Sequence, residues 1–110
     1  MIRVAILGAG IGREHLAALR QLPDQFQVAM VVDHDAARIE EIRERDSFAA
    51  VDKIETALAD PNIDVIDVCL PPHLHVETTI AALNAGKHVV CEKPLATSLA
   101  DVERIKTAAI

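Results

Sequence analysis

Three glycines follow the first apolar run of the chain and predict a binding site for phosphate. Residues 2–7 read Ile-Arg-Val-Ala-Ile-Leu, and the next five residues place glycine at positions 8, 10 and 12. Glycine permits a tight turn and lets a ligand come close to the backbone, because it has no Cβ atom. A helix that begins in such a turn directs unpaired N–H groups at the ligand. A strand, a glycine-rich turn and a helix in this order favour the pyrophosphate of a dinucleotide as that ligand.

The spacing of the glycines differs by one residue from the usual dinucleotide pattern. That pattern is G-x-G-x-x-G/A, whereas this chain reads G-x-G-x-G and has Arg13 where the last small residue is expected. The same loop also suits other nucleotide-like ligands such as S-adenosylmethionine. A glycine-rich turn can also join a strand to a helix without any ligand, so the loop by itself leaves these alternatives open.

An acidic residue at the end of the second apolar run favours a dinucleotide among these possible ligands. Asp33 follows Gly12 by 21 residues, and an acidic residue about 20 residues on binds the adenosine ribose hydroxyls in dinucleotide sites. Its charge repels a 2′-phosphate, so we predict NAD in preference to NADP. The alternative is a solvated turn aspartate that caps the next helix. Arg38, on that helix, either lies near the adenine or is an ordinary surface residue.

A second cluster of charged residues, Glu92-Lys93-Pro94, follows the apolar run that ends at Cys91. Lysine donates three hydrogen bonds from a flexible stem. Beside a nicotinamide, Lys93 could orient a substrate hydroxyl or shuttle its proton, and we take it as the candidate catalytic residue. The Lys93–Pro94 bond is a candidate cis peptide. The alternative is an ordinary turn with solvated charges.

The histidines and cysteines give no metal motif. His73 and His75 are two residues apart near a predicted helix start, so they do not share a helix face. His15 and His34 are expected at the surface, and His88 opens a strand. Cys69 and Cys91 each lie in an apolar run and are not a C-x-x-C pair, which indicates buried, reduced thiols. We therefore predict no metal site.

These residues need a scaffold, and the chain alternates strands with helices. Strands are predicted at 2–7, 26–33, 48–51, 63–70 and 88–91, and helices at 12–22, 35–45, 53–59, 73–85 and from 97 or 98 onward. This alternation predicts a Rossmann-type, doubly wound parallel sheet with the strand order 3-2-1-4-5. Ligands of such sheets bind beyond the carboxyl ends of the strands. The glycine loop, Asp33, the prolines at 71 and 72 and the Glu-Lys-Pro run are all expected at that one edge.

Length and composition exclude several classes of protein. The chain has 110 residues, a net charge of −6 and 51% hydrophobic residues, which together indicate one globular domain at residues 1–110. A nucleic-acid-binding protein would carry a basic face, so no nucleic-acid partner is expected. No apolar run is as long as the roughly 20 residues of a membrane span. Since no leader segment precedes the first predicted strand, we expect a cytoplasmic location and no membrane partner.

Four segments resemble the N-terminal domain of the Gfo/Idh/MocA oxidoreductases. They are Gly-Ala-Gly-Ile-Gly-Arg-Glu-His at 8–15, Val-Val-Asp at 31–33, Leu-Pro-Pro-His-Leu-His at 70–75 and Ala-Gly-Lys-His-Val-Val-Cys-Glu-Lys-Pro at 85–94. The last run is the most specific, and the resemblance covers essentially the whole chain. It implies hydride transfer between a nicotinamide cofactor and a hydroxyl-bearing carbon of a sugar or cyclitol. It assigns the following residues to the site: Gly8, Gly10, Ile11 and Gly12 at the pyrophosphate, Asp33 at the adenosine ribose, Leu70, Pro71 and His75 on the nicotinamide side, Glu92 at the nicotinamide ribose, and Lys93 at the substrate.

The chain departs from the family pattern in two ways. The glycine loop is one residue shorter than the commonest form. The chain also ends at Ile110, whereas family members continue into a C-terminal α/β domain that supplies substrate contacts and the oligomer interface. We therefore expect a truncated or isolated cofactor-binding domain, with a sugar-like substrate and homo-oligomers belonging to a full-length form. Two other classes remain open: a non-catalytic NAD-sensing module, and a methyltransferase-like nucleotide-binding domain.

Overall fold

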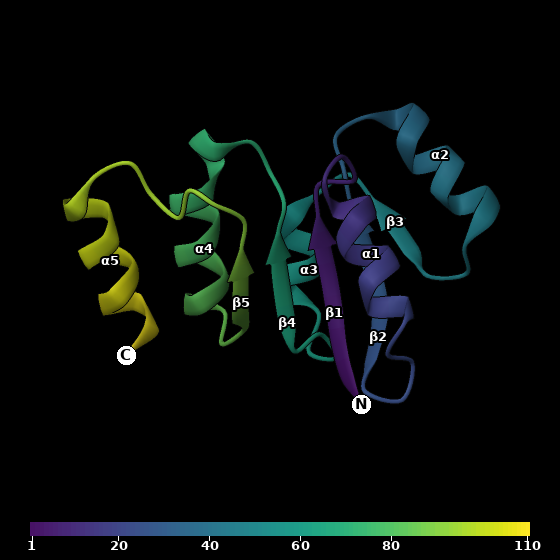
Figure 1. Ribbon diagram of the computed structural model, residues 1–110, viewed down its shortest axis with the longest axis horizontal. Helices are drawn as coiled ribbons and strands as arrows, with labels where there is room; N and C mark the ends of the chain where they lie inside the picture. Colours follow the sequence, from purple (N-terminus) through teal and green to yellow (C-terminus); the bar gives the residue numbers. More distant parts are fainter.

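A computed structural model describes all residues from 1 to 110, and its core is a five-stranded parallel sheet. The strands are β1 (Ile2–Leu7), β2 (Phe26–Val32), β3 (Ala49–Val51), β4 (Val65–Val68) and β5 (His88–Cys91). They lie in the order β3-β2-β1-β4-β5. The predicted doubly wound order is confirmed, and all five carboxyl ends lie on one side of the sheet (Figure 1).

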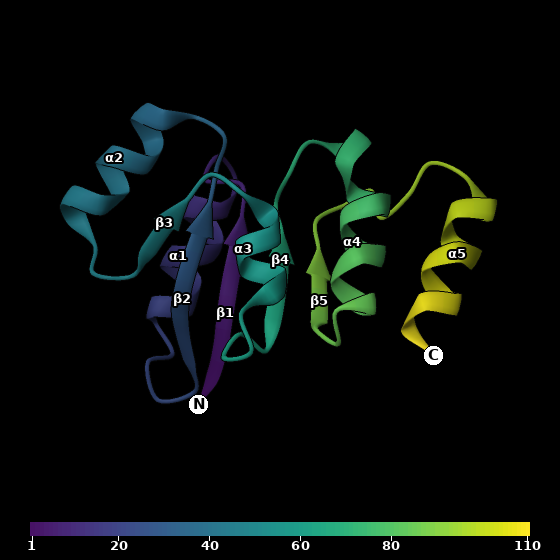
Figure 2. The same ribbon diagram turned by 180° about the vertical axis from the view of Figure 1, so that it is seen from behind.

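Helices cover both faces of this sheet. They are α1 (Gly12–Arg20), α2 (Ala36–Arg45), α3 (Ile54–Ala59), α4 (His75–Asn84) and α5 (Leu99–Ala109), with a short 3₁₀ turn at Pro72–Leu74. Helices α1 and α2 lie on one face, and α3 and α4 lie on the other (Figures 1 and 2). Helix α5 packs against α4, beyond the edge strand β5.

Side chains of β1 point alternately to the two faces of the sheet and belong to two separate apolar clusters. Ala5 and Leu7 point to the face covered by α3 and α4, whereas Val4 and Ile6 point to the face covered by α1 and α2. All four side chains are buried, because β1 lies at the centre of the sheet and is covered on both faces. The loop after β1 is thereby anchored on the buried central strand of the sheet.

Two helix boundaries differ from the sequence prediction. Helix α1 ends at Arg20, and α4 begins at His75 because Pro72 lies in the 3₁₀ turn before it. The larger apolar residues of α4, Val76, Ile80 and Leu83, are only half-buried. The buried residues of α4 are His75, Thr78, Thr79 and Ala82. Their i, i+3, i+4, i+7 spacing defines the sheet-facing side, where small side chains let the helix lie close to the strands.

Candidate functional site

The first turn of the site is fixed by Gly8, which has a left-handed backbone with φ +99°. A Cβ atom there would lie 2.6 Å from the carbonyl oxygen of Cys69. The Gly8 N–H donates to the Val32 carbonyl at 2.7 Å. Only glycine satisfies both the torsion and the close contact, so the chain leaves β1 in one defined direction, between the ends of β2 and β4.

Gly12 lets α1 pack closely against β1 despite the shortened glycine spacing. It is the first residue of α1 and is buried, and a Cβ atom at this position would lie 2.7 Å from Cγ2 of Ile6. This close packing of helix on strand is the task of the third glycine in the dinucleotide fingerprint. Gly12 performs it one residue earlier than usual, so Arg13 is free to remain exposed.

Between these two glycines the backbone presents unpaired donors. The N–H groups of Gly10, Ile11 and Gly12 donate no hydrogen bond within the chain. No side chain caps α1, whereas Asp35 and Ser98 cap the helices that follow them. The space where a Cβ of Gly10 would lie is open, with Nη1 of Arg38 the nearest atom at 4.0 Å. A cluster of free N–H groups at a helix start is an anion site.

Asp33 joins the glycine loop to the next helix. It is 4% exposed, and its carboxylate accepts hydrogen bonds from the N–H groups of Ala9 and Asp35, both at 2.8 Å. The Arg38 guanidinium lies 3.5 Å away. Burial raises the pKa of Asp33, but the two N–H donors and Arg38 outweigh burial and hold it below the usual value. Asp33 thus shapes the loop directly, and contact with a ribose remains a prediction.

The loops after β4 and β5 are tied together by His75. Its side chain is almost fully buried, and its two ring nitrogens lie 2.7 Å from the carbonyl oxygens of Leu70 and Pro94. The predicted cis peptide between Lys93 and Pro94 is present. Lys93 is exposed and forms no hydrogen bond or ion pair within the chain. The backbone of Leu70–Pro71 and the Lys93 side chain therefore lie at neighbouring strand ends, as the sequence predicted.

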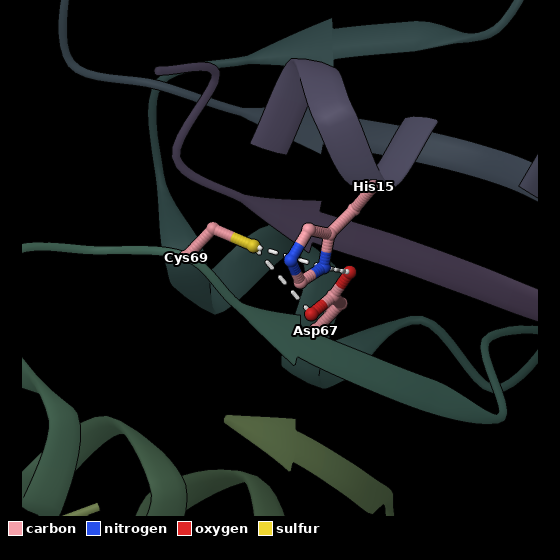
Figure 3. Close-up of side chains that lie close together, drawn as sticks. All are labelled: His15, Asp67 and Cys69. Carbon is pink, nitrogen blue, oxygen red and sulfur yellow. Dashed lines mark hydrogen bonds and ion pairs between the residues drawn. The ribbon is translucent and has the colours of Figure 1, made fainter. Parts of the chain in front are cut away.

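The structure corrects the prediction that His15 is a surface residue. Its ring lies between two carboxylates, with Nδ1 2.6 Å from Oδ2 of Asp67 and Nε2 2.8 Å from Oε1 of Glu92. Figure 3 shows the ring, carried by α1, reaching down to Asp67 of β4 and to Cys69 just after it. The Cys69 thiol donates to Oδ1 of Asp67 at 3.5 Å. We call these four residues the His15 cluster.

Only one part of the His15 cluster, Glu92, was selected from the sequence. The available signal was Asp67, an acidic residue within the otherwise apolar run 63–70, where a strand covered on both faces should be apolar throughout. Its partner His15 lies 52 residues earlier in the chain, and no local pattern links the two. Burial and the neighbouring Asp67 raise the pKa of the Cys69 thiol, so Cys69 is a neutral hydrogen-bond donor here. The two cysteines are unpaired, as expected.

Free N–H groups at a helix start, a buried aspartate directly after β2 and polar loops after β4 and β5, all at the carboxyl ends of a parallel sheet, are typical of a dinucleotide-binding domain. Comparison with known proteins identifies the family of this domain. The family model "Oxidoreductase family, NAD-binding Rossmann fold" (GFO_IDH_MocA) matches residues 2–110. The chain therefore belongs to the Gfo/Idh/MocA oxidoreductase family as its nicotinamide-dinucleotide-binding domain, and the resemblance seen in the sequence is confirmed.

Individual relatives agree with this assignment. The chain is 37% identical over 106 residues to a myo-inositol 2-dehydrogenase of Thermotoga maritima, covering 94% of this chain and 31% of the relative. A 3-ketoreductase from Actinomadura kijaniata, solved with NADP and TDP-benzene, superposes with a TM-score of 0.88 at 34% identity, covering 98% of this chain and 34% of that one. The WlbA dehydrogenase from Bordetella pertussis, solved with NADH and UDP-GlcNAcA, gives a TM-score of 0.90 at 28% identity over 98% of this chain and 34% of that one.

The chain spans about a third of the length of the curated relatives it matches. Nothing in the comparisons favours the sensing module or the methyltransferase. None of the helices combines the length and the apolar character that crossing a membrane requires.

Proposed function

We propose that the chain binds a nicotinamide dinucleotide across the carboxyl ends of β1, β2, β4 and β5. The observation that carries the proposal is the group of three free N–H donors at Gly10, Ile11 and Gly12, beside the open space at Gly10. A pyrophosphate there would receive backbone hydrogen bonds and the favourable end of the α1 dipole. The adenosine would lie towards Asp33, and the nicotinamide would lie towards Leu70, Pro71 and Glu92.

We further propose NAD as the preferred cofactor. Asp33 carries a carboxylate whose pKa is held low, so it stays charged and would repel a 2′-phosphate at the ribose. Relatives have been solved with NADP and with NADH, so the family accommodates both. Besides the exposed His34, Arg38 is the one basic residue paired with Asp33. Binding of NADP would require the Arg38 side chain to turn outward, away from Asp33. Asp33→Ala should narrow the preference for NADH over NADPH by about tenfold.

In a full-length protein we propose transfer of a hydride between the cofactor and a hydroxyl-bearing carbon of a sugar or cyclitol. The nicotinamide supplies the hydride acceptor or donor. Lys93, exposed at the end of β5 and free of partners, would hold the substrate hydroxyl and move its proton as the carbon is oxidised or reduced. The names of two relatives, a myo-inositol 2-dehydrogenase and a 3-ketoreductase, support this substrate class.

Binding is tested by titrating the chain with NADH and following the fluorescence of the reduced nicotinamide. Gly10→Ala is the informative variant, because its new methyl group fits the free protein but would occupy the space of the pyrophosphate. We expect at least a tenfold rise in Kd. Gly86→Ala is the matched control, since Gly86 lies in the turn before β5, at the opposite end of the sheet. No fluorescence change in the unmodified chain with NADH or NADPH at millimolar concentration would contradict the proposal.

A further inference from the structure

The His15 cluster places one histidine ring between two carboxylates, an arrangement that the glycine loop does not require. Asp67 is 4% exposed, and neither it nor Glu92 forms an ion pair with any lysine or arginine. A buried carboxylate needs a compensating partner. The only basic side chain paired with either carboxylate is His15, whose ring reaches Asp67 with one nitrogen and Glu92 with the other.

Counting hydrogens fixes the state of that ring. Ionised carboxylates only accept hydrogen bonds, and a neutral imidazole has a single N–H to donate. With both carboxylates ionised, the two contacts, at 2.6 and 2.8 Å, are satisfied together only when His15 carries two N–H groups and a positive charge. The cluster is then a carboxylate, an imidazolium and a second carboxylate in series, with the Cys69 thiol completing the partners of Asp67.

The far end of this series is Glu92, the one member at the cofactor site. Its side chain is 36% exposed, and only Oε1 is bonded, to His15. Oε2 forms no hydrogen bond within the chain, so it is available to a ligand. A free glutamate side chain loses rotamer freedom when it binds a ligand, which costs free energy. The Glu92 side chain has already lost that freedom, because His15 holds it.

We propose that Asp67 and His15 are positioning residues for Glu92, holding one of its carboxylate oxygens so that the other is presented to a ribose hydroxyl of the bound dinucleotide. The inference rests on the proposed function, because it needs a dinucleotide on this edge of the sheet. It also predicts a pH dependence. Cofactor binding weakens when His15 loses its second proton, because its hydrogen bond to Glu92 is then lost.

The surroundings of His15 favour the charged ring. Burial lowers its pKa, but the hydrogen bonds and charges of Asp67 and Glu92 outweigh burial and raise it above the ordinary value. Strand β4 contributes Asp67 with Cys69 just after it, and the end of β5 contributes Glu92 beside Cys91. On α1 itself the charged neighbours, Arg13 and Glu14, are exposed. Strand β1 contributes only apolar side chains, Val4 and Ile6, to this face.

A metal ion is the competing occupant of this cluster. One ligand atom each from His15, Asp67 and Cys69 lies within 4.8 Å of the others. Ligand atoms around a tetrahedral zinc ion are about 3.3 Å apart for nitrogen and oxygen, whereas Nδ1 and Oδ2 here are 2.6 Å apart. That separation is a hydrogen-bond distance, so we infer that a proton, and not a metal ion, lies between these two atoms.

The experiment measures NADH affinity of the 110-residue chain from about pH 6 to about pH 9, the range in which histidines titrate. The variants are Asp67→Asn and His15→Gln, with Asp64→Asn as the matched control because Asp64 is exposed and precedes β4. We expect the wild-type Kd to rise about tenfold across the titration of His15. His15→Gln should give a flat profile at the weaker value, and Asp67→Asn should shift the rise to lower pH. Asp64→Asn should match the wild type.

Nitrogen-15 NMR of the His15 ring gives a second readout that needs no cofactor. We expect both ring nitrogens protonated at neutral pH in the wild type, and loss of the second proton at a lower pH in Asp67→Asn. Wild-type affinity and pH profile in both variants would overturn the inference while leaving dinucleotide binding intact. A neutral ring at neutral pH, or zinc binding that displaces the ring proton, would overturn it as well. Failure of the wild type to bind either dinucleotide would overturn the proposed function and this inference together.

Discussion

Asp33 and Asp67 are equally buried acidic residues on neighbouring parts of one sheet, and they are stabilised in different ways. Asp33 directly follows β2, and its carboxylate accepts hydrogen bonds from two backbone N–H groups, those of Ala9 and Asp35. Asp67 lies within β4, and its carboxylate is hydrogen-bonded to the titratable ring of His15 and to the thiol of Cys69. Backbone donors are present at every pH, whereas the second ring proton of a histidine is not.

This difference distinguishes the two halves of the proposed cofactor site. The half around Asp33 is fixed by the chain path itself, through the glycine loop and the start of α2. The half around Glu92 is fixed by side chains that come from distant parts of the sequence. We expect the first half to respond mainly to changes in backbone fit, and the second half to respond mainly to pH.

The largest loss of stability is expected from Gly8→Ala. The residue would keep φ at +99° and place its Cβ 2.6 Å from the Cys69 carbonyl oxygen, so torsional strain and overpacking add to about 2–5 kcal/mol. Gly86→Ala separates the two costs, because Gly86 has φ +80° with no atom within 4 Å. We expect about 1 kcal/mol there. Urea unfolding of both variants measures this, and equal losses would refute the role of the close contact.

Asp33→Ala should rank second. It leaves the N–H groups of Ala9 and Asp35 without their acceptor, at a cost of about 1–3 kcal/mol in the free energy of unfolding. Asp67→Ala should cost less, about 1 kcal/mol, because the partly exposed His15 can release its proton and turn towards water. Asp24→Ala, at an exposed site without hydrogen bonds, is the surface control. A larger loss for Asp67→Ala than for Asp33→Ala would reverse the comparison.

The same contrast shows what the sequence could and could not predict. The strand order followed from alternating apolar runs, and the Asp33 position followed from its distance to the glycines, because both are local patterns. The His15–Asp67 pair could not be found, since two elements 52 residues apart bring it together. The apolar pattern does not identify the sheet-facing side of α4 either, because its buried side is made of His75, two threonines and an alanine instead of the larger apolar residues.

The pH dependence of stability should differ in sign between Asp33 and His15. The pKa of Asp33 is lowered on folding, so its contribution is present above the unfolded value of about 3.9 and is lost as the pH falls through the folded pKa. The pKa of His15 is raised, so its contribution is present below about 6.5 and is lost as the pH rises through the folded pKa.

Urea unfolding at a series of pH values tests these two limits separately. Asp33→Asn should flatten the acid side of the curve, and His15→Gln should flatten the side above neutral pH. If either substitution changes the opposite side instead, the assignment of the two limits is wrong.

The smallest change is expected from Gly10→Ala in the free protein. Gly10 lies between the two constrained glycines, but the space at its Cβ position is open. Alanine restricts the unfolded chain more than glycine does, so stability should stay within about 0.5 kcal/mol of the wild type or rise slightly. Thermal unfolding without cofactor measures this. A loss as large as that of Gly8→Ala would show that the open space is closed in solution.

Two-dimensional ¹H–¹⁵N NMR of the chain during NADH titration tests the central claim most directly. We predict that the amide signals of Gly10, Ile11 and Gly12 shift first and furthest, because their free N–H groups are the ones that receive the pyrophosphate. Signals of Leu70 and Glu92 should follow at the other end of the same edge, and Gly86 should not move. Saturable shifts centred on the opposite edge of the sheet, or no shifts at millimolar NADH, would contradict the account.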